Sequence, residues 1–266
     1  MSIIFFLLGL IIGSFLNVVV YRLNAMETLL GRSHCPHCRK KIRWYDNVPI
    51  LSFILLAAKC RDCGQKISWK YPIYEFLTGV IFMFIGNYFF SISFPITWIT
   101  TAYYLIVFSL LLVIFAYDVE YMEIPMIILW LGVGISIIYL LGIDWQRFAI
   151  VENYFDLRLV SGLMGGAMAF LFFYILAAYS KEKWMGMGDA YLGLLIGLIV
   201  GWPHVISALM LSFTVGALVS VILLSFQKKT MKSQVPFAPF MVIGTLLVVI
   251  IPEIFPQFAY LLFYFD

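Results

Sequence analysis

Long apolar runs, separated by short polar connections, recur along the whole chain. A helix that spans a bilayer needs about 20 mostly apolar residues. Eight segments reach or approach that length: 2–21, 75–94, 98–117, 125–143, 160–178, 189–202, 204–226 and 239–262. The sixth is short and rich in glycine. The pattern predicts an all-α, polytopic membrane bundle of about eight transmembrane helices.

The first apolar run begins at the N-terminus, where secretory signal peptides also lie. Segment 2–21 lacks a basic start and a small-x-small cleavage site, and its polar "GSFLN" stretch lies in its second half. We therefore expect it to be retained as a transmembrane helix.

Composition agrees with this class and excludes a soluble globular domain. Of the 266 residues, 64% are hydrophobic and 12% are charged, whereas ordinary domains carry roughly 25% charged residues. The net charge of +3 says little about nucleic acid, because membrane topology accounts for the positive residues, and we expect no nucleic-acid partner. The lipid bilayer is the expected surrounding.

Lys and Arg are concentrated in three of the polar connections. Segment 22–74 holds ten of them, 179–188 holds two and 227–238 holds three. The other side of the predicted bundle carries only Arg147 and Arg158. Basic loops stay in the cytoplasm, so these three connections are predicted to face the cytoplasm, with both termini outside.

Two aspartates that lie far apart in sequence fall at the same predicted membrane depth. Asp118, in "FAYDVEYMEIP", ends the third apolar run, and Asp189, in "GMGDAYL", opens the sixth. Two neighbouring carboxyl groups share one proton, so one can activate a water while the other polarises a carbonyl. The pair is a candidate aspartic-protease dyad. The alternative is two interfacial acids that merely face water.

All four cysteines lie in segment 22–74. They form two Cys-x-x-Cys pairs, "CPHC" at 35–38 and "CRDC" at 60–63, separated by 21 residues. This spacing is typical of a zinc ribbon in which Cys35, Cys38, Cys60 and Cys63 bind a structural Zn²⁺. Disulfides or free thiols are the alternatives, although disulfides are rare in the cytoplasm. His34 and His37 are expected to be bystanders.

The stretch "VPILSFILLAAK" lies between the two cysteine pairs. It is apolar but too short to span a bilayer. It therefore either lies on the membrane or packs under the helices.

These residues resemble the type IV leader peptidase, or prepilin peptidase, family of bacterial membrane aspartic proteases. "GSFLNVVVYRL" at 13–23 is similar to the N-terminal signature of the family, and residues 35–79 resemble its cytoplasmic zinc-knuckle domain. "VPFAPFMVIG" at 235–244 resembles its C-terminal Pro-Phe-x-Pro block. Asp118 and Asp189 stand where the resemblance places the two catalytic aspartates.

The resemblance implies an endopeptidase that removes the leader from prepilins or pseudopilins at the cytoplasmic face of the bacterial inner membrane. Many members also methylate the new N-terminus with S-adenosylmethionine. Glu75, in "YPIYEFLTG", matches a glutamate that the family links to methyl transfer. An acid stabilised at a helix N-terminus by the helix dipole is the alternative for Glu75.

The expected domain organisation follows from these assignments. Residues 1–21 form the first transmembrane helix, 22–74 a cytoplasmic zinc-binding loop domain, and 75–266 the transmembrane aspartic peptidase bundle. Two positions depart from the pattern that the resemblance implies: Met126 stands where the family usually has Asp, and Tyr191 where it usually has Lys.

Two further function classes remain open. A proton-coupled transporter would carry acids near the bilayer midplane, where this sequence is nearly free of charge. A non-catalytic assembly factor that uses a zinc-containing loop for docking would tolerate Asn at both aspartates.

Glycines in "GLMGGAMAF" at 162–170 and at 193, 197 and 201 are expected to support close helix packing. Segment 144–159 is expected to be an amphipathic surface stretch.

Overall fold

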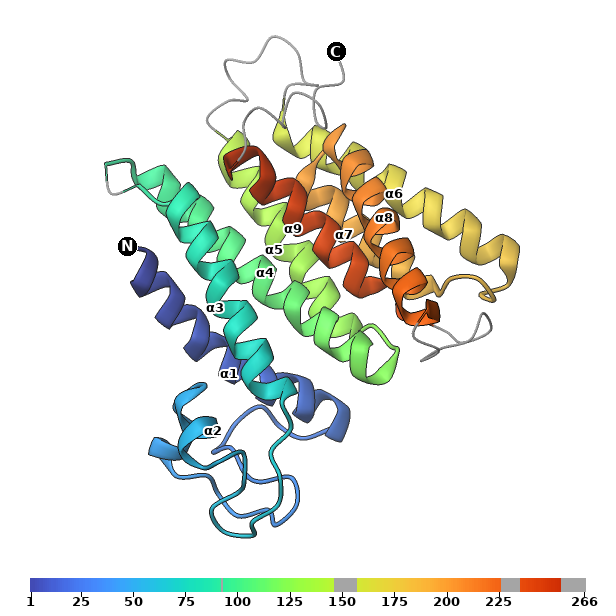
Figure 1. Cartoon of the computed structure of the whole chain (residues 1–266). Helices are drawn as coiled ribbons and strands as arrows, with labels where there is room; N and C mark the ends of the chain where they lie inside the picture. The colour runs from blue at the N-terminus through green and yellow to red at the C-terminus, as the bar shows by residue number, and fades with distance from the viewer. Residues whose placement is uncertain (92, 146–156, 226–234, 255–266) are drawn as a thin grey trace. The chain divides into compact units, whose positions relative to one another are not determined.

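The computed structural model describes residues 1–91, 93–145, 157–225 and 235–254, and within them the chain is built from helices (Figure 1). The helices are α1 (Ser2–Ala25), α2 (Leu51–Leu55), α3 (Lys70–Phe89), α4 (Pro95–Tyr121), α5 (Met126–Asp144), α6 (Arg158–Ser180), α7 (Met187–Val200), α8 (His204–Ser225) and α9 (Ala238–Ile254), with one 3₁₀ turn, η1 (Trp44–Asn47). β structure in these ranges is limited to two isolated bridges. The predicted all-α class is confirmed.

Each of the eight predicted apolar segments overlaps one of the described helices. Six of them, α1, α3, α4, α5, α6 and α8, are long and apolar enough to cross a membrane. The chain is therefore a multi-pass membrane protein. α7 and α9 are shorter, with 14 and 17 residues, so a total of eight spans stays a prediction.

The first polar segment is shorter than its predicted limits of 22–74. α1 continues to Ala25, where Met26 adopts a left-handed conformation with a φ of 54° and ends the helix. α3 begins at Lys70. Hydropathy marks where a helix leaves the apolar layer, whereas the backbone stays helical until a residue breaks the hydrogen-bond pattern.

The chain divides into two compact units, Met1–Ala116 and Tyr117–Asp266. In the first unit α1 packs along α3, and the loop that carries α2 lies at one end of this pair (Figure 1). The amide of Asn17 donates a hydrogen bond to the carbonyl oxygen of Tyr71 at 3.1 Å. The polar "GSFLN" stretch thus faces the neighbouring helix.

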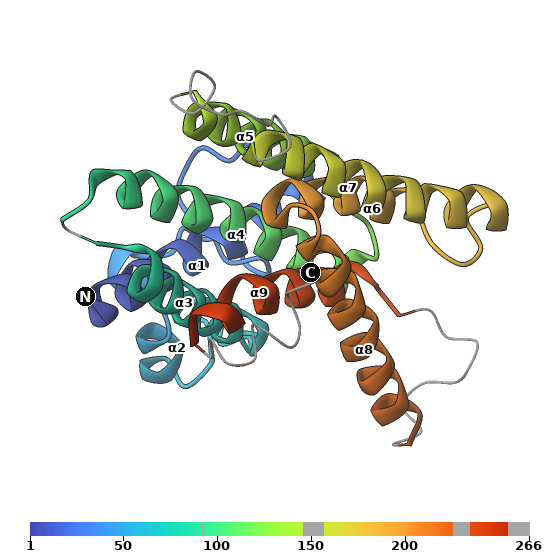
Figure 2. The same ribbon diagram turned by 90° about the horizontal axis from the view of Figure 1, so that it is seen from above.

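In the second unit α7 is the central helix and contacts α5, α6, α8 and α9. α6 and α7 lie side by side (Figure 2), and glycines form their contact. A Cβ on Gly197 would collide with the backbone of Gly165 and Gly166. The predicted glycine-mediated packing is confirmed, because only bare backbone allows this approach.

Segment 144–159 lies mostly outside the described residues. Its first residue, Asp144, is fully buried and accepts a hydrogen bond from the backbone N–H of Leu159 at 2.7 Å. Leu159 is in the first turn of α6, so Asp144 caps this helix.

Candidate active site and metal centre

Asp118 and Asp189 both belong to the second unit. Asp118 lies in the last turn of α4 and is 6% exposed, and Asp189 lies in the first turn of α7 and is partly buried. Their carboxyl groups are near enough for a Coulomb repulsion between them when both are ionised. The structure thus brings together two residues that α5 and α6 separate along the chain.

Segment 235–244, which resembles the Pro-Phe-x-Pro block of the family, supplies a contact to Asp118. The backbone N–H of Ala238, the first residue of α9, donates a hydrogen bond to the Asp118 carboxyl group. The first N–H groups of a helix have no partner inside it, so α9 offers a natural donor here. Oδ2 of Asp118 is buried and has no hydrogen-bond partner among the described residues. It remains available to a proton, a water or a substrate.

Gly188, just before Asp189, allows α7 to approach the segment that follows Asp118. A Cβ on Gly188 would lie 3.2 Å from the Ile124 side chain. The backbone N–H of Gly186 donates a hydrogen bond to the Asp189 carboxyl group. "GMGD" is therefore a close-packed turn that presents one carboxylate at the start of a helix.

The four cysteines gather at one point in the first unit. Their Sγ atoms all lie within 4.8 Å of one another, and those of Cys35 and Cys63 are 3.9 Å apart. A tetrahedral Zn²⁺ with bonds of about 2.3 Å separates its sulfur ligands by about 3.8 Å. A disulfide needs about 2 Å, and all four thiols are free. The cluster is compatible with a structural zinc site.

The two cysteine pairs sit in equivalent turns. The N–H of Cys35 bonds to the carbonyl of Lys40 at 3.0 Å, and that of Cys60 bonds to Gln65 at 2.8 Å. Each turn contains a residue of positive φ just after its second cysteine, Arg39 and Gly64. The sequence carries a signal for this that the cysteine spacing alone does not give: "CPHCRKKI" at 35–42 repeats as "CRDCGQKI" at 60–67.

The flanking histidines do not join the cysteine cluster. The group of possible metal ligands in the described chain contains only cysteines. His34 instead lies 3.6 Å from the carboxylate of Glu27 and packs edge-on against Tyr21.

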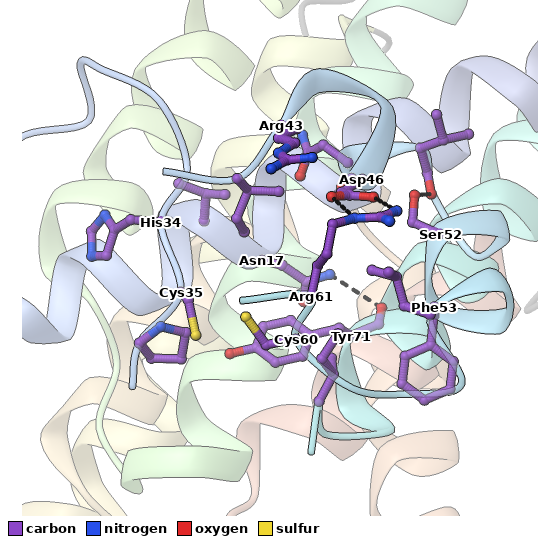
Figure 3. Close-up of a pocket in the computed structure, with 18 of the residues that line it drawn as sticks. Asn17, His34, Cys35, Arg43, Asp46, Ser52, Phe53, Cys60, Arg61 and Tyr71 are labelled. Atoms are coloured by element: carbon purple, nitrogen blue, oxygen red, sulfur yellow. Dashed lines mark hydrogen bonds and ion pairs between the residues drawn. The ribbon is translucent and has the colours of Figure 1, made fainter. Parts of the chain in front are cut away.

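A cavity of about 200 Å³ lies in the first unit, between the cysteine loop and the facing parts of α1 and α3 (Figure 3). Its polar lining includes Asn17, Tyr21, Asp46, Arg61 and Glu75, and Cys35 and Cys60 also border it. The cysteine cluster therefore forms part of the cavity wall.

An ion pair closes one side of the cavity. Arg61, next to Cys60, donates hydrogen bonds to both carboxylate oxygens of Asp46 at 2.6 and 2.8 Å, as the dashed lines in Figure 3 show. These hydrogen bonds lower the pKa of Asp46 below its ordinary value. The pair ties the second cysteine turn to η1. Nothing in the motif pattern predicts it, because the two residues belong to different local structures.

Glu75 borders the same cavity and is 8% exposed. Its carboxylate accepts hydrogen bonds from the backbone N–H of Ile50, at 2.7 Å, and from the hydroxyl of Ser14. Ser14 belongs to the "GSFLN" stretch of α1. Glu75 thus joins α1, α3 and the cysteine loop, which the sequence pattern did not indicate.

Comparisons with known proteins agree with both parts of the chain. The profile of the bacterial peptidase A24 N-terminal domain matches residues 7–89, and that of the type IV leader peptidase family matches residues 105–221. A prepilin leader peptidase/N-methyltransferase of Bacillus subtilis is 31% identical over 247 residues, which cover 92% of each chain. The chain belongs to the type IV leader peptidase family.

Two other relatives bear the same name as the Bacillus subtilis protein. The one from Vibrio cholerae is 34% identical over 75% of this chain and 77% of its own length. The one from Myxococcus xanthus is 32% identical over 84% of this chain, which spans 63% of the length of that relative. No solved structure matches the chain.

Within this leader peptidase family member, the two profiles cover different features. The N-terminal profile, at 7–89, contains the cysteine cluster and the cavity, and the second, at 105–221, contains both aspartates. Each feature can therefore be tested by itself.

The two departures from the family pattern have different surroundings. The ring of Tyr191 lies 5.8 Å from that of Trp130 and 5.6 Å from that of Phe170. Tyr191 thus belongs to an aromatic cluster between α5, α6 and α7. Met126 is the first residue of α5 and is 40% exposed.

Proposed function

We propose that this chain is a membrane aspartic endopeptidase in which Asp118 and Asp189 remove the leader peptide of type IV prepilins or pseudopilins. The nearness of the two carboxyl groups carries this proposal. It is supported by the family membership and by relatives named prepilin leader peptidase/N-methyltransferase. The transporter and assembly-factor alternatives are not favoured, because neither accounts for this family.

The reaction requires one proton shared between the two acids. The ionised carboxylate takes a proton from a water, whose oxygen attacks the scissile carbonyl carbon. The protonated partner donates to the carbonyl oxygen as charge develops on it. When the tetrahedral intermediate collapses, the C–N bond breaks and the leaving amine takes a proton from the pair. The buried Oδ2 of Asp118, without a partner among the described residues, suits this exchange.

The position of the dyad suits a substrate that has a charged leader at one end and an apolar stem after it. Both aspartates lie at the ends of apolar helices, where charged leader residues stay in water and the apolar stem stays in the bilayer. The basic connections support a cytoplasmic orientation of this end, in the inner membrane of a bacterium.

A second activity, N-methylation of the new N-terminus, is proposed for the first unit. Cys35, Cys38, Cys60 and Cys63 would hold a structural Zn²⁺ that fixes the cavity wall. The cavity would hold S-adenosylmethionine, which would supply an electrophilic methyl group on a positively charged sulfur. The polar lining includes the amide of Asn17 and the carboxylate of Glu75, beside the basic residues Lys40, Lys41, Arg43 and Arg61, and would offer hydrogen bonds to such a ligand. Glu75 would act there as a positioning residue through Ile50.

The functional division proposed for the chain follows these roles. Residues 1–21 anchor the chain, 22–74 form the zinc-binding loop domain, and 75–266 carry the peptidase. Helix bounds shift these limits by a few residues, because α3 begins at Lys70.

The decisive experiment combines the purified protein with a prepilin, with and without S-adenosylmethionine, and follows the substrate by mass spectrometry. Loss of the leader mass shows the peptidase, and a further methyl mass that appears only with the donor shows the second activity. An intact substrate, with a protein that remains folded, contradicts the proposal.

A further inference from the structure

The short helix α2 exposes most of its apolar side chains. Ser52 and Phe53 are buried, whereas Leu51, Ile54 and Leu55 are 52%, 66% and 74% exposed. Five residues are far too few to span a bilayer. A helix that turns three large aliphatic side chains outward needs an apolar surrounding.

Two contacts place α2 beside the start of α3. The backbone N–H of Ile50, the residue before α2, bonds to Glu75, and the ring of Phe53 packs on that of Trp69 at a centroid distance of 4.8 Å. Glu75 is the sixth residue of α3, so it lies about 7.5 Å along the axis from the first. α2 therefore lies at the level of the first turns of a helix long and apolar enough to cross a membrane.

The exposed side chains of α2 continue an apolar stripe on α3. Trp69, Ile73 and Phe76 follow one another at helical spacing on one face and are 70%, 50% and 52% exposed. Trp69 joins this stripe to α2 through Phe53. Because the outer face of a spanning helix meets lipid, the same lipid layer reaches α2.

Charge and aromatic residues agree with an interfacial position. Lys59 and Lys66 face each other in an isolated bridge just beyond α2, and both are exposed. Lysines near a cytoplasmic leaflet attract its anionic headgroups. Exposed tryptophans such as Trp69 prefer the boundary between headgroups and acyl chains.

We propose that α2 is an interfacial membrane anchor whose side chains Leu51, Ile54 and Leu55 insert into the boundary of headgroups and acyl chains of a phospholipid bilayer. The buried face of α2 transmits this position to the cavity. The Ser52 hydroxyl donates to the carbonyl oxygens of Tyr45 and Val48, which flank Asp46 in the cavity wall. The bilayer surface thereby helps to set the distance of the cysteine loop from the membrane.

A photo-crosslinking experiment on the full chain tests this proposal. A benzoylphenylalanine replaces Ile54 in one variant and His37, an exposed residue of the first cysteine turn, in the control. Both are reconstituted into nanodiscs of phosphatidylethanolamine and phosphatidylglycerol, irradiated and analysed by mass spectrometry. A melting temperature equal to that of the unmodified chain shows that each variant is folded.

We expect lipid adducts at position 54 several-fold above those at position 37, whether or not a prepilin is present. Equal lipid yields at the two positions overturn the proposal. Adducts at position 54 that join only to a second copy of the chain, to another part of the same chain or to an added prepilin also overturn it. Neither result depends on whether the chain cleaves its substrate.

Discussion

The carboxylate of Glu75 holds the backbone N–H of Ile50 at 2.7 Å, although the two residues are 25 positions apart. Ile50 has a φ of 58°, which a β-branched residue rarely adopts. A nearly buried acid in α3 therefore fixes a strained point at the start of α2. Through this contact, Glu75, which we propose as a positioning residue for methyl transfer, acts on the shape of the cysteine loop.

Replacing Glu75 separates a positioning role from a chemical one. Glu75→Ala leaves the Ile50 N–H without its acceptor, which costs about 1–3 kcal/mol, and we expect it to abolish methyl transfer. Glu75→Gln keeps an acceptor oxygen, so methyl transfer should stay within about tenfold of the unmodified protein. Mass spectrometry of the product N-terminus measures both.

Leader removal serves as the internal control for these two variants, because both aspartates lie in the other unit. We expect it to be unchanged. If Glu75→Gln and Glu75→Ala lose methyl transfer equally while both stay folded, the carboxylate takes part in the chemistry and the positioning role is wrong.

The aspartates are tested by removing charge without changing size. Asp118→Asn and Asp189→Asn each deprive the pair of the shared proton. Leader removal should fall by at least about 100-fold in either variant, since positioned acids and bases contribute 10²–10⁴-fold. The rate of appearance of the mature pilin on a gel measures this effect.

Glu182→Gln supplies the matched control for the dyad. It changes an exposed acid in the connection that leads to α7, and its leader removal should match that of the unmodified chain. Full activity of Asp118→Asn or Asp189→Asn would show that the two carboxyl groups do not form the catalytic pair.

Zinc content tests the cysteine cluster directly. Purified protein should carry one zinc per chain by elemental analysis, and Cys60→Ala should lose most of it, because three thiolates bind zinc far less well than four. Methyl transfer should fall with the metal, since Cys60 borders the cavity. Leader removal should persist.

His37→Ala is the control for the metal site, because this exposed residue lies between Cys35 and Cys38 but outside the ligand group. It should retain zinc and both activities. A chain that holds no zinc when purified without chelators, or a Cys60→Ala protein with unchanged metal content, would contradict the site.

Much of this arrangement was predictable from sequence, and the exceptions share a cause. Apolar run length predicted the helices, and charge asymmetry predicted that Asp118 and Asp189 lie at one membrane depth, because both signals are local. The contact of Ala238 with Asp118, and that of Arg61 with Asp46, join segments distant in sequence. No periodicity encodes such pairs. The sequence motifs indicated which segments carry these residues but not which residue each of them contacts.

The glycines of α6 and α7 give a prediction about stability. Gly197→Val adds a branched side chain where α7 touches the backbone of Gly165 and Gly166. Overpacking a tight contact costs about 1–3 kcal/mol or more, so the melting temperature in detergent should fall. Leader removal should fall with it, because α7 carries Asp189. Gly134→Val is the control, since a Cβ at Gly134 has no atom within 4 Å among the described residues. Equal melting temperatures for the two variants would mean that α6 and α7 do not pack through these glycines.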